Sequence, residues 1–149
     1  MFKKIITSFM LVGFVCGFSF AADEFALLGE ERIGNLRIGL SEGEVKKIVH
    51  CDLKRRPAKY MAGDGVYHQE WEYTGCGIIL DLVSDKKVAP KSIESITLVS
   101  PSTLSTKRGV RIGSTEQEVM KAYEPYWNRE DSEHFGHFVA GSIYGGLIF

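Results

Sequence analysis

The sequence predicts an α+β protein made of two tandem units, each a short helix followed by an antiparallel hairpin. Three observations carry this prediction. The stretch LRIGLSEGEVKKIV at residues 36–49 recurs without a gap as VRIGSTEQEVMKAY at residues 110–123, with seven of fourteen positions identical. Both copies contain a helix-start signal, and segments of alternating apolar and polar residues follow. Because an internal repeat marks one supersecondary unit, the chain is expected to form the same unit twice.

Residues 1–21 have the features of a cleaved export signal. A short basic region precedes an apolar run over residues 5–18, and small residues near Ala21 predict cleavage after that residue. A retained anchor is disfavoured because the apolar run is short. A lipoprotein signal ending at Cys16 is disfavoured because the bulky Val15 precedes it. The sequence therefore predicts a periplasmic or secreted protein whose mature chain has no transmembrane span.

The mature chain is slightly acidic and lacks familiar catalytic motifs. Without the two lysines of the signal, 16 basic residues stand against 19 acidic ones, a net charge near −3. The longest basic run, residues 54–56, is typical of a solvated loop, so nucleic acid is not an expected partner. The sequence has no phosphate-binding glycine loop before a helix and no GxSxG motif. These features predict a protein that is not an enzyme and has no cofactor and no metal.

Two cysteines remain after the signal, which contains Cys16, is removed. An even number of cysteines in an exported chain typically indicates disulfide pairing. A metal site would need further ligands in range, and a catalytic thiol would need a nearby base. We therefore predict a disulfide between Cys51 and Cys76.

Each copy of the repeat predicts a capped helix. In the first copy Ser41 and Glu44 form a capping box, in which the hydroxyl accepts the amide of Glu44 and the carboxylate reaches back to the amide of Ser41. Thr115 and Glu118 repeat this device. Apolar residues then recur at helical spacing, which gives each short helix one apolar stripe.

The Arg-Ile-Gly element before each capping box could be a functional site, because it recurs. A structural role is favoured, since Gly39 and Gly113 permit a tight turn into the cap. Arg37 and Arg111 are then expected on the surface or paired with an acid. Before the first copy, residues 22–33 show no clear period and are expected to be a loosely docked lead-in.

The first helix is followed by polar loop residues and then by three predicted strands. Residues 66–73 and 76–83 alternate on either side of a Thr-Gly turn, and residues 93–99 follow a loop. The predicted disulfide directs Cys76 toward the helix, so by alternation Asp81 faces away. The residues in phase with the cysteine then form the core face: Ile78, Leu80 and Leu82.

The predicted first unit covers residues 22–100, a Ser/Thr-rich linker covers residues 101–107, and a shorter second unit covers residues 108–149. The hairpin of the second unit is predicted at residues 134–140 and 143–149. No counterpart of the third strand follows. The open edge is therefore either covered internally or available to a partner strand.

The repeat resembles a known superfamily. A hydrophobic residue, Arg-Ile-Gly, Ser or Thr, and Glu-x-Glu-Val lead into a short helix and a hairpin with Trp and Tyr. This pattern is similar to the repeat of the β-lactamase inhibitor protein (BLIP) family and of the outer-membrane assembly lipoproteins of the SmpA/OmlA (BamE) type. The resemblance implies short helices packed on one face of a curved antiparallel sheet, whose open face grips a protein. It transfers no contact residues, because the second copy lacks the cysteines of the inhibitors and the lipidated cysteine is poorly supported.

One candidate surface is the strand face turned away from the helices. His68, Glu70, Glu72 and Asp81 are expected to share it as an exposed acidic surface for a partner. Paired carboxylates can also perform acid–base chemistry when burial raises one pKa, which keeps an enzyme as an alternative. Three aromatic residues on the opposite face are either binding anchors or core beneath the first helix: Tyr67, Trp71 and Tyr73.

The second unit supplies further candidates for partner binding. Tyr126 and Trp127 follow the second helix and are candidates for exposed anchors. His134 and His137 are candidates in the predicted strand, where they would point to opposite faces. Since no third ligand accompanies these histidines, a metal site is not expected.

These features predict an exported, non-catalytic protein-binding module that acts in the periplasm in the manner of an inhibitor or immunity protein. The expected partner is another protein, such as an envelope or secreted enzyme or toxin. The alternative is an outer-membrane assembly or envelope-structural accessory protein of the SmpA/OmlA type.

Overall fold

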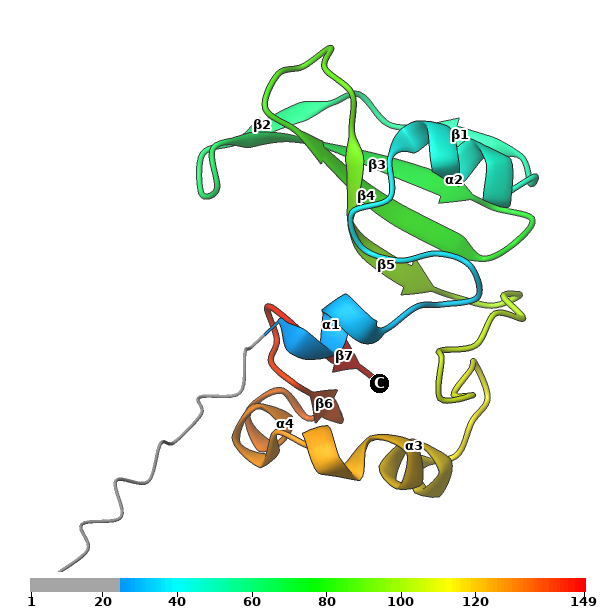
Figure 1. Ribbon diagram of the computed structural model, residues 1–149, viewed down its shortest axis with the longest axis vertical. Helices are drawn as coiled ribbons and strands as arrows, with labels where there is room; N and C mark the ends of the chain where they lie inside the picture. The colour runs from blue at the N-terminus through cyan, green and yellow to red at the C-terminus, as the bar shows by residue number, and fades with distance from the viewer. Residues whose placement is uncertain (1–24) are drawn as a thin grey trace, which may run out of the picture.

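The computed structural model describes residues 25–149, so the predicted signal at residues 1–21 lies outside the described residues. The fold is α+β, as predicted, with a five-stranded antiparallel sheet and several short helices (Figure 1). Within the described range, no helix combines the length and the apolar character that crossing a bilayer requires. The elements are α1 (Ala26–Glu30), α2 (Glu42–Ile48), β1 (Leu53–Arg55), β2 (Lys59–Met61), β3 (Val66–Tyr73), β4 (Ile78–Ser84), β5 (Ser92–Leu98), α3 (Glu116–Tyr123), the 3-10 turn η1 (Glu124–Tyr126), α4 (Arg129–Phe135), β6 (Val139–Ala140) and β7 (Leu147–Ile148).

The sheet is built on the predicted hairpin. β3 pairs with β4 along nearly its whole length, and β5 pairs with the other side of β4. The remaining edge of β3 is shared by two three-residue strands, β1 and β2. We predicted a polar loop between α2 and β3, and that prediction is wrong for the residues of β1 and β2. Three residues are too few to show an alternating pattern, and these strands form because β3 offers an edge of unpaired backbone groups.

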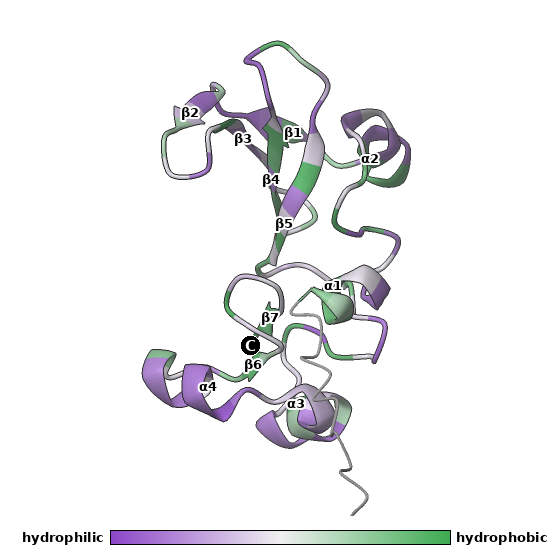
Figure 2. Ribbon diagram, turned by 60° about the vertical axis from the view of Figure 1, so that its left-hand side comes forward, coloured by the Kyte–Doolittle hydropathy of each residue, from purple (hydrophilic) through white to green (hydrophobic). Residues whose placement is uncertain are grey.

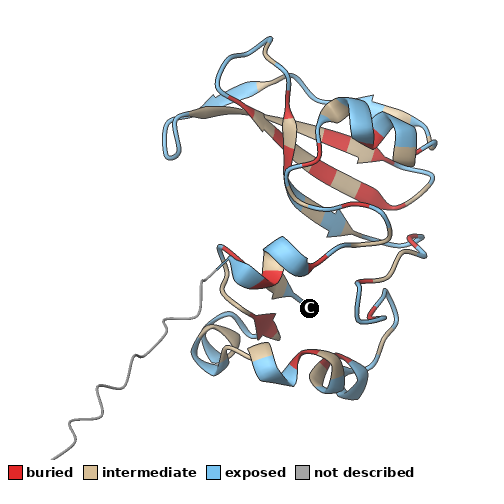
Figure 3. Cartoon of the chain, viewed as in Figure 1, coloured by how far each residue is buried: buried red, intermediate tan, exposed pale blue. Residues whose placement is uncertain are grey.

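The main core lies between α2 and one face of the sheet (Figure 3). Trp71 is 1% exposed there, and Tyr73 and Leu80 are also buried, which confirms the predicted strand phase. The aromatics of β3 are therefore core residues, apart from the half-buried Tyr67. α2 begins at the predicted capping box: the Ser41 amide donates to Glu44 Oε2 at 2.8 Å, and the Ser41 hydroxyl accepts the Glu44 amide.

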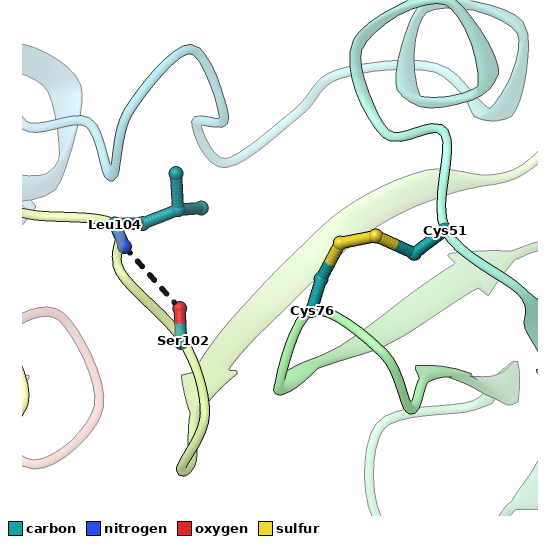
Figure 4. Close-up of a disulfide and its surroundings, with 4 residues drawn as sticks. All are labelled: Cys51, Cys76, Ser102 and Leu104. Atoms are coloured by element: carbon teal, nitrogen blue, oxygen red, sulfur yellow. Dashed lines mark hydrogen bonds between the residues drawn. A yellow bond between two sulfur atoms is a disulfide. The ribbon is translucent and has the colours of Figure 1, made fainter.

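The predicted disulfide is present. It joins Cys51, just after α2, to Cys76 in the turn between β3 and β4, with Cα atoms 6.1 Å apart (Figure 4). Ser102 and Leu104, from the segment after β5, lie near the bridge in the same view. The bridge therefore fixes the end of α2 to the sheet, on the face that α2 covers.

The second half repeats the turn and the capped helix. Thr115 and Glu118 form both capping-box bonds of α3. Gly39 and Gly113, at equivalent places before the two helices, both have positive φ, 82° and 90°, a conformation that glycine adopts without steric cost. The structural role predicted for these glycines is confirmed.

The predicted second hairpin is largely wrong. His134 lies in α4, and only β6 and β7, two residues each, form strands in residues 134–149. α4 forms because Asn128 caps its first turn by accepting the Asp131 amide at 3.0 Å, and because Gly136 ends it with φ 69°. These local stop and start signals outweigh the weak alternation of the following residues.

A second, smaller core holds the C-terminal half together. It joins Leu27 of α1, Val119 and Tyr123 of α3, Ala140 of β6, and Val110 from the segment before α3. Leu27 is 5% exposed, so the predicted loosely docked lead-in is instead a short packed helix. Figure 2 shows α1 beside β7 and α3, with the sheet above them.

Candidate functional site

A histidine held by carboxylates marks the sheet face that α2 leaves open. His68 on β3 places Nδ1 2.5 Å from Asp81 Oδ2 on β4 and Nε2 2.6 Å from Asp64 Oδ2 in the β2–β3 turn. Glu94 Oε2 on β5 lies 3.6 Å from Nδ1. The structure therefore brings together two residues of the predicted acidic surface, His68 and Asp81, and adds two that the sequence pattern did not reveal.

The hydrogen bonds within the cluster shift the pKa values of the histidine and of one of its carboxylates. The hydrogen bond that His68 donates to Asp81, aided by the one it donates to Asp64, raises the pKa of His68 despite partial burial. The same bond from His68 lowers the pKa of Asp64. Because both ring nitrogens meet carboxylates, both hydrogen bonds require the doubly protonated ring, which has no nitrogen free to act as a base. Possible ligand atoms of Asp64, His68 and Glu94 also lie within 4.8 Å of one another, but the doubly protonated ring has no lone pair to offer a cation.

Replacing His68 by glutamine is expected to change how stability depends on pH. A raised folded pKa stabilises the fold fully below the unfolded value of about 6.5 and loses that contribution as pH rises through the folded pKa. The wild-type advantage over His68→Gln is therefore expected to be largest in mild acid and to shrink in alkali. Urea unfolding across a pH series measures this advantage, and an advantage that grows with pH would contradict the cluster described here.

The other predicted acids of this face contact bases on the β1 side. Glu70 accepts the Arg56 Nε–H at 2.5 Å, and Glu72 lies opposite Lys54 on β1. On the β4 side, Glu70 stands directly opposite Asp81 of the histidine cluster, so acids and bases are paired only along the β1 side of the open face. Such cross-strand pairing stabilises a sheet and gives the face no strong net charge over its β1 side.

The predicted anchors of the second half are partly internal. Trp127 stacks on Phe138 with ring centroids 5.9 Å apart and donates its indole N–H to Ser132 Oγ at 3.0 Å. Tyr126 packs against the second core, and its hydroxyl accepts a hydrogen bond from Arg108. The prediction that these two rings are exposed is wrong, since both are half-buried. His134 on α4 and His137 just after it are exposed, as are several of their neighbours.

An apolar hollow lies between β5 of the sheet and β7 near the C-terminus. It is a groove of about 550 Å³. Its apolar lining comes from both halves of the chain and includes Leu28, Ile33, Ile96, Leu98, Leu147 and Phe149. The two halves thus meet around a shared apolar surface that neither core fills.

Both copies of the repeat contribute to this groove. Arg37 and Ile38 of the first copy line it together with Arg111 and Ile112 of the second. Ile112 is 48% exposed, whereas Ile38 is half-buried. The repeated Arg-Ile pair therefore lines the groove in both copies. Gly39 and Gly113 do not line it and instead allow the tight turns before the helices.

The β5 edge beside the groove is half covered. Ile93 donates to Leu40 O at 2.9 Å and accepts the Gly39 amide at 2.8 Å, so the first repeat turn pairs with the start of the strand. At the other end Val99 donates to Gly77 O, on the β4 side. Because backbone groups alternate in an antiparallel strand, those of Ile96 and Leu98 point to the open edge. Within residues 25–149 this part of the edge has no backbone partner.

The rim of the groove is basic. Arg32, Arg37 and Arg111 are exposed, and within the described chain none lies within 4.0 Å of a carboxylate oxygen. The carboxylate of Glu31, which also borders the groove, is engaged internally. It accepts the Lys107 amide at 2.7 Å and the Tyr123 hydroxyl at 2.8 Å. Among residues 25–149 the groove thus has three guanidinium groups around an apolar floor that form no close ion pair, although Arg37 and Arg111 are near enough to Glu44 and Glu118 to help lower the pKa of those carboxyls.

Sequence reasoning missed the groove, although one signal pointed to it. Arg37 and Arg111 recur with their isoleucines, and both arginines are exposed, although the turn and the cap use only the glycine and the capping box. No family model, curated protein or solved structure matches this chain, so the site is described from its own geometry.

Proposed function

We propose that this protein is an exported, non-catalytic binding module that holds a segment of a partner protein in the groove between β5 and β7. The observation that carries the proposal is the groove itself, which combines an apolar floor, a strand edge with unpaired backbone groups and a basic rim. Polypeptide segments supply the complementary features: apolar side chains, main-chain hydrogen bonds and carboxylates. A periplasmic inhibitor or immunity protein would use such a groove to occupy its target.

The duplicated sequence supports a tandem origin for the groove. The two copies share the turn glycine with positive φ, the capping box and the Arg-Ile pair that borders the groove. We propose that the copies are tandem units of the kind found in BLIP-like and BamE-like proteins, with a reduced hairpin in the second unit. Export to the periplasm is part of the proposal, and the Cys51–Cys76 disulfide is compatible with an oxidising compartment.

Site-specific photo-cross-linking in cells that export the protein tests this proposal. A benzophenone amino acid at Ile112, on the groove, is expected to trap a partner polypeptide. The matched control places it at Val88, which is 93% exposed in the β4–β5 loop, and a third position, Glu72, samples the open sheet face. Cross-links from Glu72 but not from Ile112 would contradict the proposal. An outer-membrane assembly component trapped at Ile112 would favour the accessory-protein alternative.

A further inference from the structure

We infer, resting on the proposed function, that the groove takes an extended acidic segment, which adds to the sheet as a strand along the open edge of β5. This inference names the conformation and the charge of the guest. Three features of the groove carry it: the backbone of β5, the apolar surfaces on either side and the arginines at the rim.

The β5 edge already accepts a strand-like segment over its first residues. Ser41 pairs with Ser92 in an antiparallel bridge, and the Glu42 amide donates to Lys91 O at 2.9 Å. That pairing ends at Ile93, and the unpaired stretch runs over residues 94–98. A guest strand of about five residues, about 17 Å long, matches this stretch.

The side chains beside the edge select alternating apolar residues. Ile96 and Leu98 are half-buried, pack against the main core and form the wall of the groove on the sheet side. Ile112 and Ile148, exposed by 48% and 55%, lie on the opposite wall. A strand on this edge directs every second side chain between these two walls, where its burial removes apolar surface from water.

The rim selects the charge of the guest. The chain carries 18 basic and 19 acidic residues, yet the groove borders on three arginines without a carboxylate partner among the residues described. Glu31, the acid beside them, is held internally by the Lys107 amide and the Tyr123 hydroxyl, and its Oε2 lies 3.9 Å from Arg108 Nε. Guanidinium groups bind carboxylates with paired hydrogen bonds, so acids flanking the apolar stretch complement Arg37 and Arg111.

Peptide titration followed by NMR tests the inference on residues 22–149. The probe is acetyl-Glu-Val-Thr-Val-Thr-Val-Glu-amide. One comparison peptide replaces both glutamates with lysine, and another carries N-methyl groups on the valines, which block strand pairing without changing charge. We expect binding of the probe at millimolar concentration or below, and at least tenfold weaker binding of both comparison peptides.

Paired variants locate the charge effect. Arg37→Gln with Arg111→Gln is expected to weaken probe binding about tenfold and to reduce its salt dependence. Lys86→Gln with Lys87→Gln, the same charge change in the exposed β4–β5 loop, is expected to leave the affinity unchanged. Equal binding of the N-methylated or lysine peptide, or no probe binding at millimolar concentration, would overturn the inference. If Ile112 still cross-links a partner, the proposed function survives that result, whereas loss of both refutes both.

Discussion

Replacing Glu31 by alanine is expected to lower the free energy of unfolding by about 3 kcal/mol, because a buried charged acceptor of several hydrogen bonds is lost. Glu31 is 7% exposed and connects the end of α1 to the segment after β5 and to α3. Its carboxylate accepts the amides of Lys107 and Arg32 and the hydroxyl of Tyr123, which is fully buried. The alanine variant leaves the Tyr123 hydroxyl and the Lys107 amide without their acceptor. Urea unfolding at neutral pH measures the loss.

A double-mutant cycle separates this network from simple loss of packing. Glu31→Gln keeps the size of the side chain, and Tyr123→Phe removes only the hydroxyl. Burial raises the pKa of Tyr123, so at neutral pH the hydroxyl remains a donor to Glu31. The two changes are expected to be non-additive by about 1 kcal/mol or more. Additive effects would show that the hydrogen bond contributes little to stability.

Replacing Trp71 by alanine is expected to cost about 3–5 kcal/mol, the range for removing a large aromatic side chain from a core. The ring fills the space beneath α2, with its indole N–H donating to Gln69 at 3.2 Å. The Arg55 guanidinium lies 4.6 Å from the ring centroid, so the variant also loses a cation–π contact. Thermal or urea unfolding, with circular dichroism as the readout, checks the expected loss.

Trp127→Ala is the matched control. Trp127 is the other tryptophan of the chain, but it is half-buried and packs on the smaller second half. Its removal is expected to cost clearly less than the removal of Trp71. An equal or larger cost would mean that the principal core does not lie between α2 and the sheet.

Elements with local signals were predictable from the sequence. The capping boxes at Ser41 and Thr115 are decided within four residues, and the alternation in β3 placed Trp71 and Tyr73 on one face, which the structure shows to be the core face. The pairing of Cys51 with Cys76 followed from the number of cysteines and the predicted export signal. Each of these features depends on interactions between residues close in sequence or on chemistry with few alternatives.

Elements that depend on distant partners were not predictable. β1 and β2 exist because β3 offers an edge, and Leu27 is buried because α1 reaches the second core. The groove was not predicted from the sequence, for the same reason. Arg37 and Arg111 are 74 residues apart, and only the folded chain shows that both border one groove. The histidine cluster was half predicted, since His68 and Asp81 share a hairpin while Asp64 and Glu94 come from outside it.

The central claim is that the open edge of β5 is where a partner segment binds. Amide hydrogen exchange, followed by NMR with and without the acidic probe peptide, tests it most directly. Addition of the peptide is expected to slow exchange at Ile96 and Leu98, whose backbone groups point to the open edge, and to leave Glu70 and Glu72 on β3 unchanged. Slowed exchange confined to the open sheet face, with Ile96 and Leu98 unchanged, would contradict the claim.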